Sequence, residues 1–192
     1  MARTQVGKRE RLVTAAARVL YEQGVEKTTI ADIARTAEVP VGNVYYYFKT
    51  KDQLVEAAME EQARALRTMT DAFEGFATPQ ERLKALLGGW AEQREQAARF
   101  GCPTGSMSSE LGKRDDGLHR SAATVMGLLV EWVERQFTLM GRADARELAV
   151  SLVASYQGIS LLTNVFADPE LMAAQLRRLE DWIDGLDAAE GA

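Results

Sequence analysis

The chain has 192 residues, of which 46% are hydrophobic and 27% charged, with a formal net charge of −5. The length suits one compact unit or a small domain joined to a larger one, and the composition is typical of a soluble protein. No uncharged apolar stretch approaches the roughly 18 residues of a membrane span, and no apolar segment follows the basic N-terminus as in a signal peptide, so we expect a cytoplasmic protein. One cysteine, Cys102, excludes an internal disulfide framework.

The charge is unevenly distributed along the chain. Residues 1–52 hold nine Lys or Arg against six Asp or Glu, a net charge of +3, and the remainder holds 14 against 22, a net charge of −8. Such an asymmetry indicates a partner of opposite charge for the basic part. An excess of three charges is small, so the functional argument must rest on motifs.

Almost the whole chain is predicted to be helical. Its four prolines, at positions 40, 79, 103 and 169, each fit a helix boundary, and no alternating strand pattern of useful length occurs. We therefore predict an all-α chain of about nine helices. Their approximate ranges are 5–23, 29–36, 41–48, 50–74, 79–100, 106–111, 118–140, 143–166 and 169–186.

Residues 24–51 carry the strongest functional signal. Two short predicted helices separated by a tight turn, behind a longer packing helix, have the layout of a helix-turn-helix. A helix that enters the major groove of DNA needs small residues at its leading end and hydrogen-bonding side chains along one face. Val41, Gly42 and Asn43 supply a small leading end and a polar reader.

Further contacts are expected with the phosphate backbone of DNA. The hydroxyls of Tyr45 and Tyr46 can reach phosphates, and Thr29 lies at a helix N-terminus, which is a natural phosphate site. Lys49 and Lys51 add positive charge. The predicted DNA-binding residues are Thr29, Val41, Gly42, Asn43, Tyr45, Tyr46, Lys49 and Lys51.

Tyr45 to Phe48 are four consecutive aromatic residues, which could alternatively all belong to a core. A helix this short cannot bury four neighbouring side chains, because they point in all directions around it. We expect Phe48 and one face of Tyr47 to be buried and at least one other tyrosine to face solvent or a ligand.

The same segment resembles the DNA-binding domain of the TetR/AcrR family of bacterial regulators. The matching pattern begins with Gly24, Thr29 and the run Ile30 to Ala34, and continues from Val39 to Phe48 and from Lys51 to Leu54. The resemblance covers about a quarter of the chain. Pro40 stands where the family more often has serine, and Tyr47 where histidine is frequent. The resemblance implies a DNA-binding domain over 1–50 and a helical ligand-binding and dimerisation domain over 51–192.

In this family the last two long helices usually pair with those of a partner in a four-helix bundle, so we expect a homodimer through 143–166 and 169–186. Two recognition helices about one turn of DNA apart imply a pseudo-palindromic operator. Helices that are apolar on more than one face fit this role. The predicted stripes of 143–166 are Leu148, Leu152, Tyr156, Ile159, Thr163 and Phe166, and the smaller residues Ala149, Val153 and Ser160. The predicted face of 169–186 is Leu176, Leu179, Trp182, Ile183 and Leu186.

The resemblance also implies a small-molecule inducer bound in the middle of the helical domain. Methionine and aromatic side chains make adaptable walls for apolar ligands, although the same residues could simply fill a core. The candidate ligand-binding residues are Trp90, Phe100, Cys102, Met107, Leu111, Met126, Leu129, Phe137 and Tyr156.

Cys102 lies in a Gly-Cys-Pro-Thr-Gly stretch that resembles one in a subset of TetR-like regulators. A following helix N-terminus and nearby Arg99 would favour its thiolate. The alternative function is therefore a repressor switched by covalent modification of Cys102. Against it stands the interpretation of Cys102 as a small buried hydrophobic residue.

Other functional classes have weaker support. His119, the only histidine, could bind a metal only with Asp115, Asp116 or Glu110. This is a sparse ligand set, and adjacent acidic residues in a loop are more often solvated, so we predict no metal and no cofactor. An enzyme with Cys102 as nucleophile lacks a nearby base, and Ser106, Ser108 and Ser109 lack His/Asp partners, so no catalytic residue is predicted. A module that binds DNA without sequence preference, and an activator in place of a repressor, remain alternatives.

Overall fold

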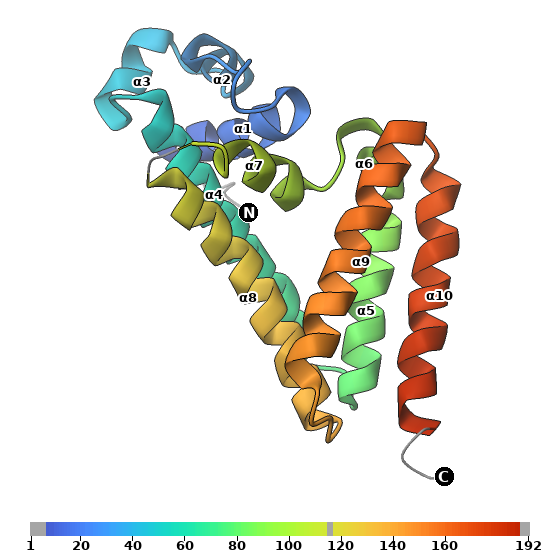
Figure 1. Cartoon of the computed structure of the whole chain (residues 1–192). Coiled ribbons are helices and arrows are strands. Elements are labelled where there is room, and N and C mark those ends of the chain that lie inside the picture. Colours follow the sequence, from blue (N-terminus) through green and yellow to red (C-terminus); the bar gives the residue numbers. More distant parts are fainter. Residues whose placement is uncertain (1–6, 115–116, 189–192) are drawn as a thin grey trace, which may run out of the picture. The chain divides into compact units, whose positions relative to one another are not determined.

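The computed structural model of the chain describes residues 7–114 and 117–188, which form ten helices and no strand (Figure 1). The predicted all-α class is confirmed. The helices are α1 (Lys8–Gln23), α2 (Ile30–Thr36), α3 (Val41–Tyr47), α4 (Lys51–Phe73), α5 (Pro79–Glu92), α6 (Arg94–Phe100), α7 (Pro103–Leu111), α8 (Leu118–Leu139), α9 (Ala145–Phe166) and α10 (Pro169–Ala188).

The helix predicted over 79–100 is in fact two helices that meet at Gln93. The backbone of Gln93 leaves the helical region (φ −92°, ψ 7°) and its N–H donates to Trp90 O, which closes a tight last turn of α5. No proline or glycine marks this break, so periodicity alone could not predict it. The prolines predicted helix boundaries correctly. Pro79, Pro103 and Pro169 each open a helix, and Pro40 is the N-cap of α3.

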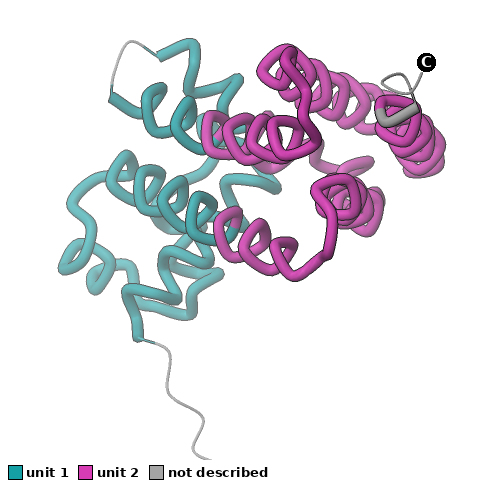
Figure 2. The backbone as a smooth tube through the Cα atoms, turned by 90° about the horizontal axis from the view of Figure 1, so that it is seen from below, with its two compact units in different colours: residues 1–65, 106–125 teal, residues 66–105, 126–192 magenta. Residues whose placement is uncertain are grey.

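The chain divides into two compact units (Figure 2). One is made of 1–65 with 106–125, and the other of 66–105 with 126–192. Helices α4, α7 and α8 each contribute residues to both units. The predicted boundary at residue 50 describes a division of function, which this division by contacts does not test, so it stays a prediction.

The first unit is organised by α1. One face of α1 is buried against α2, and α3 packs on α2 in turn. Val44 is the one buried residue of α3, and Phe48, the C-cap of this helix, is buried as well. The guanidinium of Arg9 lies over the Phe48 ring, 5.4 Å from its centroid. The buried residues of α1 are Leu12, Val13, Ala15, Ala16, Val19 and Leu20.

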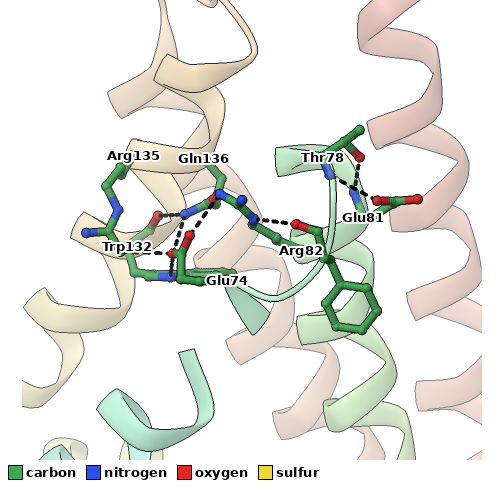
Figure 3. Close-up of polar contacts among 8 residues, drawn as sticks. Glu74, Thr78, Glu81, Arg82, Trp132, Arg135 and Gln136 are labelled. Atoms are coloured by element: carbon green, nitrogen blue, oxygen red, sulfur yellow. Dashed lines mark hydrogen bonds and ion pairs between the residues drawn. The ribbon is translucent and has the colours of Figure 1, made fainter. Parts of the chain in front are cut away.

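In the second unit, α10 packs on α5 and α9, as Figure 1 also shows, and α6 packs on α9. A polar cluster joins the end of α4 to α5 and α8 (Figure 3). Glu74 Oε1 accepts hydrogen bonds from Trp132 Nε1 (3.0 Å), Arg135 (3.2 Å) and Gln136 (3.4 Å), while its Oε2 pairs with Arg82 at 2.8 Å. Gln136 is fully buried, so these hydrogen bonds offset the cost of removing its amide from water.

Candidate nucleic-acid interface

A capping box fixes the start of α2. Thr29 Oγ1 accepts from Asp32 N at 3.2 Å, and Asp32 Oδ2 accepts from Thr29 N at 3.0 Å. The Thr29 hydroxyl, and after it the Thr29 backbone N–H and Arg35, donate to the Asp32 carboxylate and lower its pKa below the ordinary 3.8. The cap is therefore strongest above about pH 4 and is lost as the carboxylate becomes protonated.

The turn between α2 and α3 is held by backbone hydrogen bonds. Ala37 N donates to Ile33 O, and Val39 N donates to Ala34 O, both at 2.9–3.0 Å. Between them Glu38 has a positive φ of 54°, the left-handed conformation that ends many helices. Val39, only 4% exposed, anchors this turn in the core. The turn thus sets the direction in which α3 leaves α2.

α3 presents most of its side chains to solvent. Tyr46 is 79% exposed, Tyr45 47% and Val41 43%, and Gly42 and Asn43 are also exposed. Tyr47 is half-buried and lies edge-on to Tyr46, with ring centroids 5.0 Å apart. Because residues four apart are neighbours on a helix, Val41 lies beside Tyr45 and Gly42 beside Tyr46. The structure therefore brings the predicted reading residues of α3 together on one outward surface.

The two predicted lysines lie in different surroundings. Lys49 is exposed and its Nζ donates to Tyr45 O at 2.6 Å, next to the outward surface of α3. Lys51 Nζ instead donates to Val25 O (2.8 Å), Glu26 O (3.4 Å) and Thr28 O (3.1 Å). These carbonyls lie between α1 and α2, where no helix partner pairs them. A phosphate contact by Lys51 would require its ammonium to leave all three.

The candidate ligand-binding residues are distributed over both units. Met107 and Leu111 belong to the first unit, and the other seven to the second. In the second unit Trp90 and Tyr156 stack at 3.7 Å between ring centroids, and both belong to a core cluster with Cys102, Leu129 and Phe137. This packing is what a filled core requires, so a ligand contact by any of these side chains stays a prediction.

Cys102 is buried, with 7% of its surface exposed. Its Sγ accepts hydrogen bonds from Gly105 N (3.3 Å) and Gln157 Nε2 (3.5 Å). The guanidinium of Arg99 lies over the Phe100 ring, 5.0 Å from its centroid. Gly101 ends α6 with a φ of 77° and is buried, so the turn and its packing explain why glycine occupies this position. Thiol sensing stays a prediction.

No group of three or more His, Cys, Asp or Glu side chains is placed to hold a metal ion within the part of the chain that the structure describes. Two of the three suggested partners of His119, Asp115 and Asp116, lie outside that part, and the third, Glu110, accepts hydrogen bonds from Val25 N and Glu26 N.

Sequence reasoning missed the exposed face of α9. The predicted stripes face this unit's own core: Ala149, Val153 and Ser160 are at most 4% exposed, and of the larger stripe only Phe166 is largely exposed. On α10, Leu176 and Ile183 are likewise buried within the unit. The open face of α9 combines small residues with larger apolar ones. The small residues are Ser151, Ala154, Ser155 and Gly158, and the larger apolar ones are Val150, Leu161, Leu162, Val165 and Phe166.

Apolar residues occur on every side of α9, so the sequence pattern could not distinguish the face used inside the chain from the face left open. By length and composition it is the one helix among the described residues that could cross a membrane, with a mean hydropathy of 1.3 and 39% of that window buried. The expectation that no stretch has this character was therefore wrong for α9. Core helices pass the same test, so this is weak evidence for a membrane.

Comparison with known proteins agrees with this geometry. The family model "Bacterial regulatory proteins, tetR family" matches residues 12–58. An HTH-type transcriptional regulator of Mycobacterium tuberculosis, MT0206, is 30% identical over 185 residues, which cover 90% of this chain and 94% of that protein. The regulator BetI of Burkholderia mallei is 27% identical over 191 residues and 93% of each chain.

Among solved structures, SCO4454 of Streptomyces coelicolor, a TetR-family transcriptional regulator, superimposes with a TM-score of 0.80 at 22% identity over 92% of this chain and 93% of its own. The fold, the surface of α3 and a relative aligned over nearly its full length thus agree. The chain belongs to the TetR family of bacterial transcriptional regulators, which bind DNA operators, dimerise and are not enzymes.

Proposed function

We propose that this regulator is a ligand-responsive repressor that holds a pseudo-palindromic operator as a homodimer and releases it when a small, largely apolar molecule binds within 51–192. The observation that carries the DNA-binding part is the outward surface of α3. Five of its seven residues are exposed although three of these, Val41, Tyr45 and Tyr46, are large apolar or aromatic side chains that water does not favour.

The roles of these side chains follow from the chemistry of DNA. The Asn43 amide can donate to and accept from one base edge at once, as asparagine does with adenine. Tyr45 and Tyr46 direct hydroxyls to phosphates, and Lys49 supplies charge beside them. The N-terminus of α2 at Thr29 offers a further phosphate the backbone N–H groups between those of Thr29 and Asp32, which the capping box uses.

The open face of α9 supports dimerisation through the C-terminal helices. Small side chains at Ser151, Ala154, Ser155 and Gly158 allow another helix to come close, and the large apolar side chains from Leu161 onward gain by leaving water. An added Cβ at Gly158 would meet nothing within 4 Å, so this glycine leaves room at the surface. A two-fold interface of this kind would place the same patch of each copy together.

The switch requires two arrangements of the dimer with different affinities for DNA. An inducer that binds better to the arrangement unable to match the groove spacing lowers DNA affinity in proportion to that preference, typically by 1–3 kcal/mol of coupling. Operator and inducer then exclude one another.

The decisive experiment is selection of bound sequences from a random pool of double-stranded DNA at about 150 mM salt, because phosphate contacts make affinity salt-dependent. We expect a short inverted repeat to be enriched. Asn43→Ala should relax base preference at one position in each half-site, with a cost of about 1–3 kcal/mol. Gln23→Ala, which removes an exposed amide of α1, is the matched control.

Failure to enrich any repeat, repeated after the protein has been denatured and refolded to strip a co-purified ligand, would overturn the proposal. The inducer part is tested separately, by challenging the complex of protein and selected repeat with a panel of small apolar molecules. A repressor of this kind should release DNA with at least one of them.

The alternative switch at Cys102 receives no added support from the burial of its thiol, because a modifying reagent needs access to the sulfur. Unchanged release of DNA by Cys102→Ser, on treatment with an oxidant or an electrophile that acts on the wild type, would dispose of it.

A further inference from the structure

The backbone between α1 and α2 lacks helical partners for several polar groups. Gly24 ends α1 with a φ of 82°, and residues 25–28 lead directly to the N-cap of α2 at Thr29. Backbone N–H and C=O groups that leave a helix must find other partners or remain in water. In this turn both kinds are paired, by side chains from two distant segments of the chain.

Lys51 of α4 binds the carbonyl side of the turn, through its hydrogen bonds to Val25 O, Glu26 O and Thr28 O. Glu110 of α7 binds the amide side. Its Oε2 accepts from Val25 N at 2.8 Å and from Glu26 N at 3.3 Å, across 85 and 84 residues of sequence. The turn is therefore bound on one side by an ammonium and on the other by a carboxylate, both through charge-assisted hydrogen bonds.

The position of Glu110 is not explained by its own helix. It lies in the last turn of α7, where the negative end of the helix dipole disfavours an acidic side chain. Gly24 fits the carboxylate closely, because an added Cβ there would lie 2.7 Å from Glu110 Oε1. The glycine thus serves both the left-handed backbone and the approach of the carboxylate.

A second contact supports the same segment. Just beyond α7, an Nη atom of Arg114 lies 3.0 Å from both carboxylate oxygens of Asp52, the residue after Lys51. Residues 106–125 belong to the same compact unit as α1, α2 and α3. This segment therefore holds both the α1–α2 turn and the start of α4.

We propose that Glu110 is a positioning residue for DNA binding, which fixes the α1–α2 turn and through it the orientation of α2 and α3. The inference rests on the proposed function, since its readout is affinity for the selected DNA repeat. It also gives α7 a direct connection to the DNA-binding helices. A change in α7 that withdraws the carboxylate would free the two amides of the turn.

The sign of the effect separates positioning from charge. Glu110 is acidic, so if it acted only through its charge, its removal would reduce repulsion of DNA and strengthen binding. If Glu110 instead positions the α1–α2 turn, its removal should weaken DNA binding. We expect Glu110→Ala to weaken binding to the selected repeat about tenfold or more, because it removes two hydrogen bonds to a charged acceptor. Glu110→Gln, which keeps an accepting oxygen, should lose less.

Glu60→Gln and Glu60→Ala are the matched controls, since they remove an exposed carboxylate of α4 with the same change in net charge. Hydrogen exchange of the Val25 and Glu26 amides gives an independent readout, and both amides should exchange faster in Glu110→Ala. Thermal unfolding shows whether each variant is folded, and Glu110→Gln carries the test if Glu110→Ala is not.

The inference is wrong if folded Glu110 variants bind the repeat as tightly as the wild type or more tightly, or if the two amides keep their protection. A wild-type protein that selects no repeat would instead contradict the proposed function, and unchanged amide protection in Glu110→Ala would still count against Glu110 by itself.

Discussion

Gly42 lies in the exposed surface of α3, beside Tyr46, and nothing within the chain requires a glycine there. An added Cβ would meet no atom within 4 Å, and no positive φ is recorded at this position. Glycine inside a helix costs about 0.5–1 kcal/mol relative to alanine, because it loses more backbone freedom on folding. On the outward surface of α3, close approach of a DNA backbone or base edge would give this glycine a use that a side chain would obstruct.

Gly42→Ala should therefore separate stability from binding. We expect the free energy of unfolding to rise by about 0.5–1 kcal/mol, because the helix gains and no contact is lost. Affinity for the selected repeat should fall by about tenfold or more, since the added methyl group obstructs close approach. Denaturant titration and DNA titration of the same preparation measure both.

Gly88→Ala is a suitable control, since Gly88 lies in α5 and an added Cβ there also meets nothing within 4 Å. It should gain stability without loss of DNA affinity. Equal DNA binding by Gly42→Ala and the wild type would remove the argument that this glycine serves the groove.

Among the elements, those defined by local chemistry were predictable from sequence. Residues 24–48 contain a capping box at Thr29, a turn before Pro40 and a helix with one buried residue, and all of these depend on neighbours in the sequence. Partners distant in sequence were not predictable. Lys51 was expected to face DNA because it is basic and follows α3, yet its ammonium lies on the α1–α2 turn.

The same limit applies to α9 and to the break at Gln93. Apolar residues occur on every side of α9, so periodicity cannot tell which side the chain itself covers. Seven of the nine candidate ligand-binding residues are buried, and Phe100 and Met126 are partly buried, but no sequence pattern distinguishes a filled core from a pocket wall.

The junction of α4, α5 and α8 depends on one carboxylate. Glu74 accepts from Trp132, Arg135 and Gln136 and pairs with Arg82, so its removal takes the acceptor from the Trp132 indole N–H and one of the partners from Gln136 and Arg82 (Figure 3). We expect Glu74→Ala to lower the free energy of unfolding by about 1–3 kcal/mol. The fluorescence of Trp132, whose indole N–H loses its acceptor, should also change.

Asp71→Ala provides the comparison, because Asp71 is an exposed carboxylate one turn earlier on α4. Its effect on unfolding should be within about 0.5 kcal/mol of zero. A similarly small effect of Glu74→Ala would mean that the cluster is replaced by water without loss.

For the whole molecule, the charge distribution makes DNA binding depend on a dimer, and the open face of α9 is the proposed dimer interface. A net charge of −5 repels DNA at a distance, so binding must come from the local basic part, with its +3 over residues 1–52, presented twice. Presentation of two headpieces at a fixed spacing requires a stable dimer. We therefore expect DNA affinity to depend on the dimer interface as well as on the residues of α3.

The pair Leu161→Glu and Val165→Glu tests this dependence. Both side chains are more than 60% exposed, so the substitutions leave the chain's own core intact. At a two-fold interface each substitution occurs in both copies, so four carboxylates would be buried for each dimer formed. We therefore expect the dissociation constant of the dimer to rise at least about 100-fold. Sedimentation at micromolar concentration measures it, and binding to the inverted repeat should weaken accordingly.

Leu139→Glu, at an equally exposed leucine at the end of α8, is the control and should leave the dimer intact. If the α9 variant sediments like the wild type, the dimer uses another face.

The fit of Gly24 to Glu110 has a consequence for the evolution of these regulators. A side chain at position 24 would compete with the carboxylate at position 110 for the same space, so a residue other than glycine at 24 is expected only where the residue at 110 is shorter than glutamate. The reverse does not hold, because the φ of 82° and ψ of 162° at Gly24 belong to a backbone region that side chains rarely adopt. Among homologues we therefore expect a one-sided dependence: lineages that keep the acid at 110 keep glycine at 24, and lineages that lose the acid still retain the glycine for its backbone.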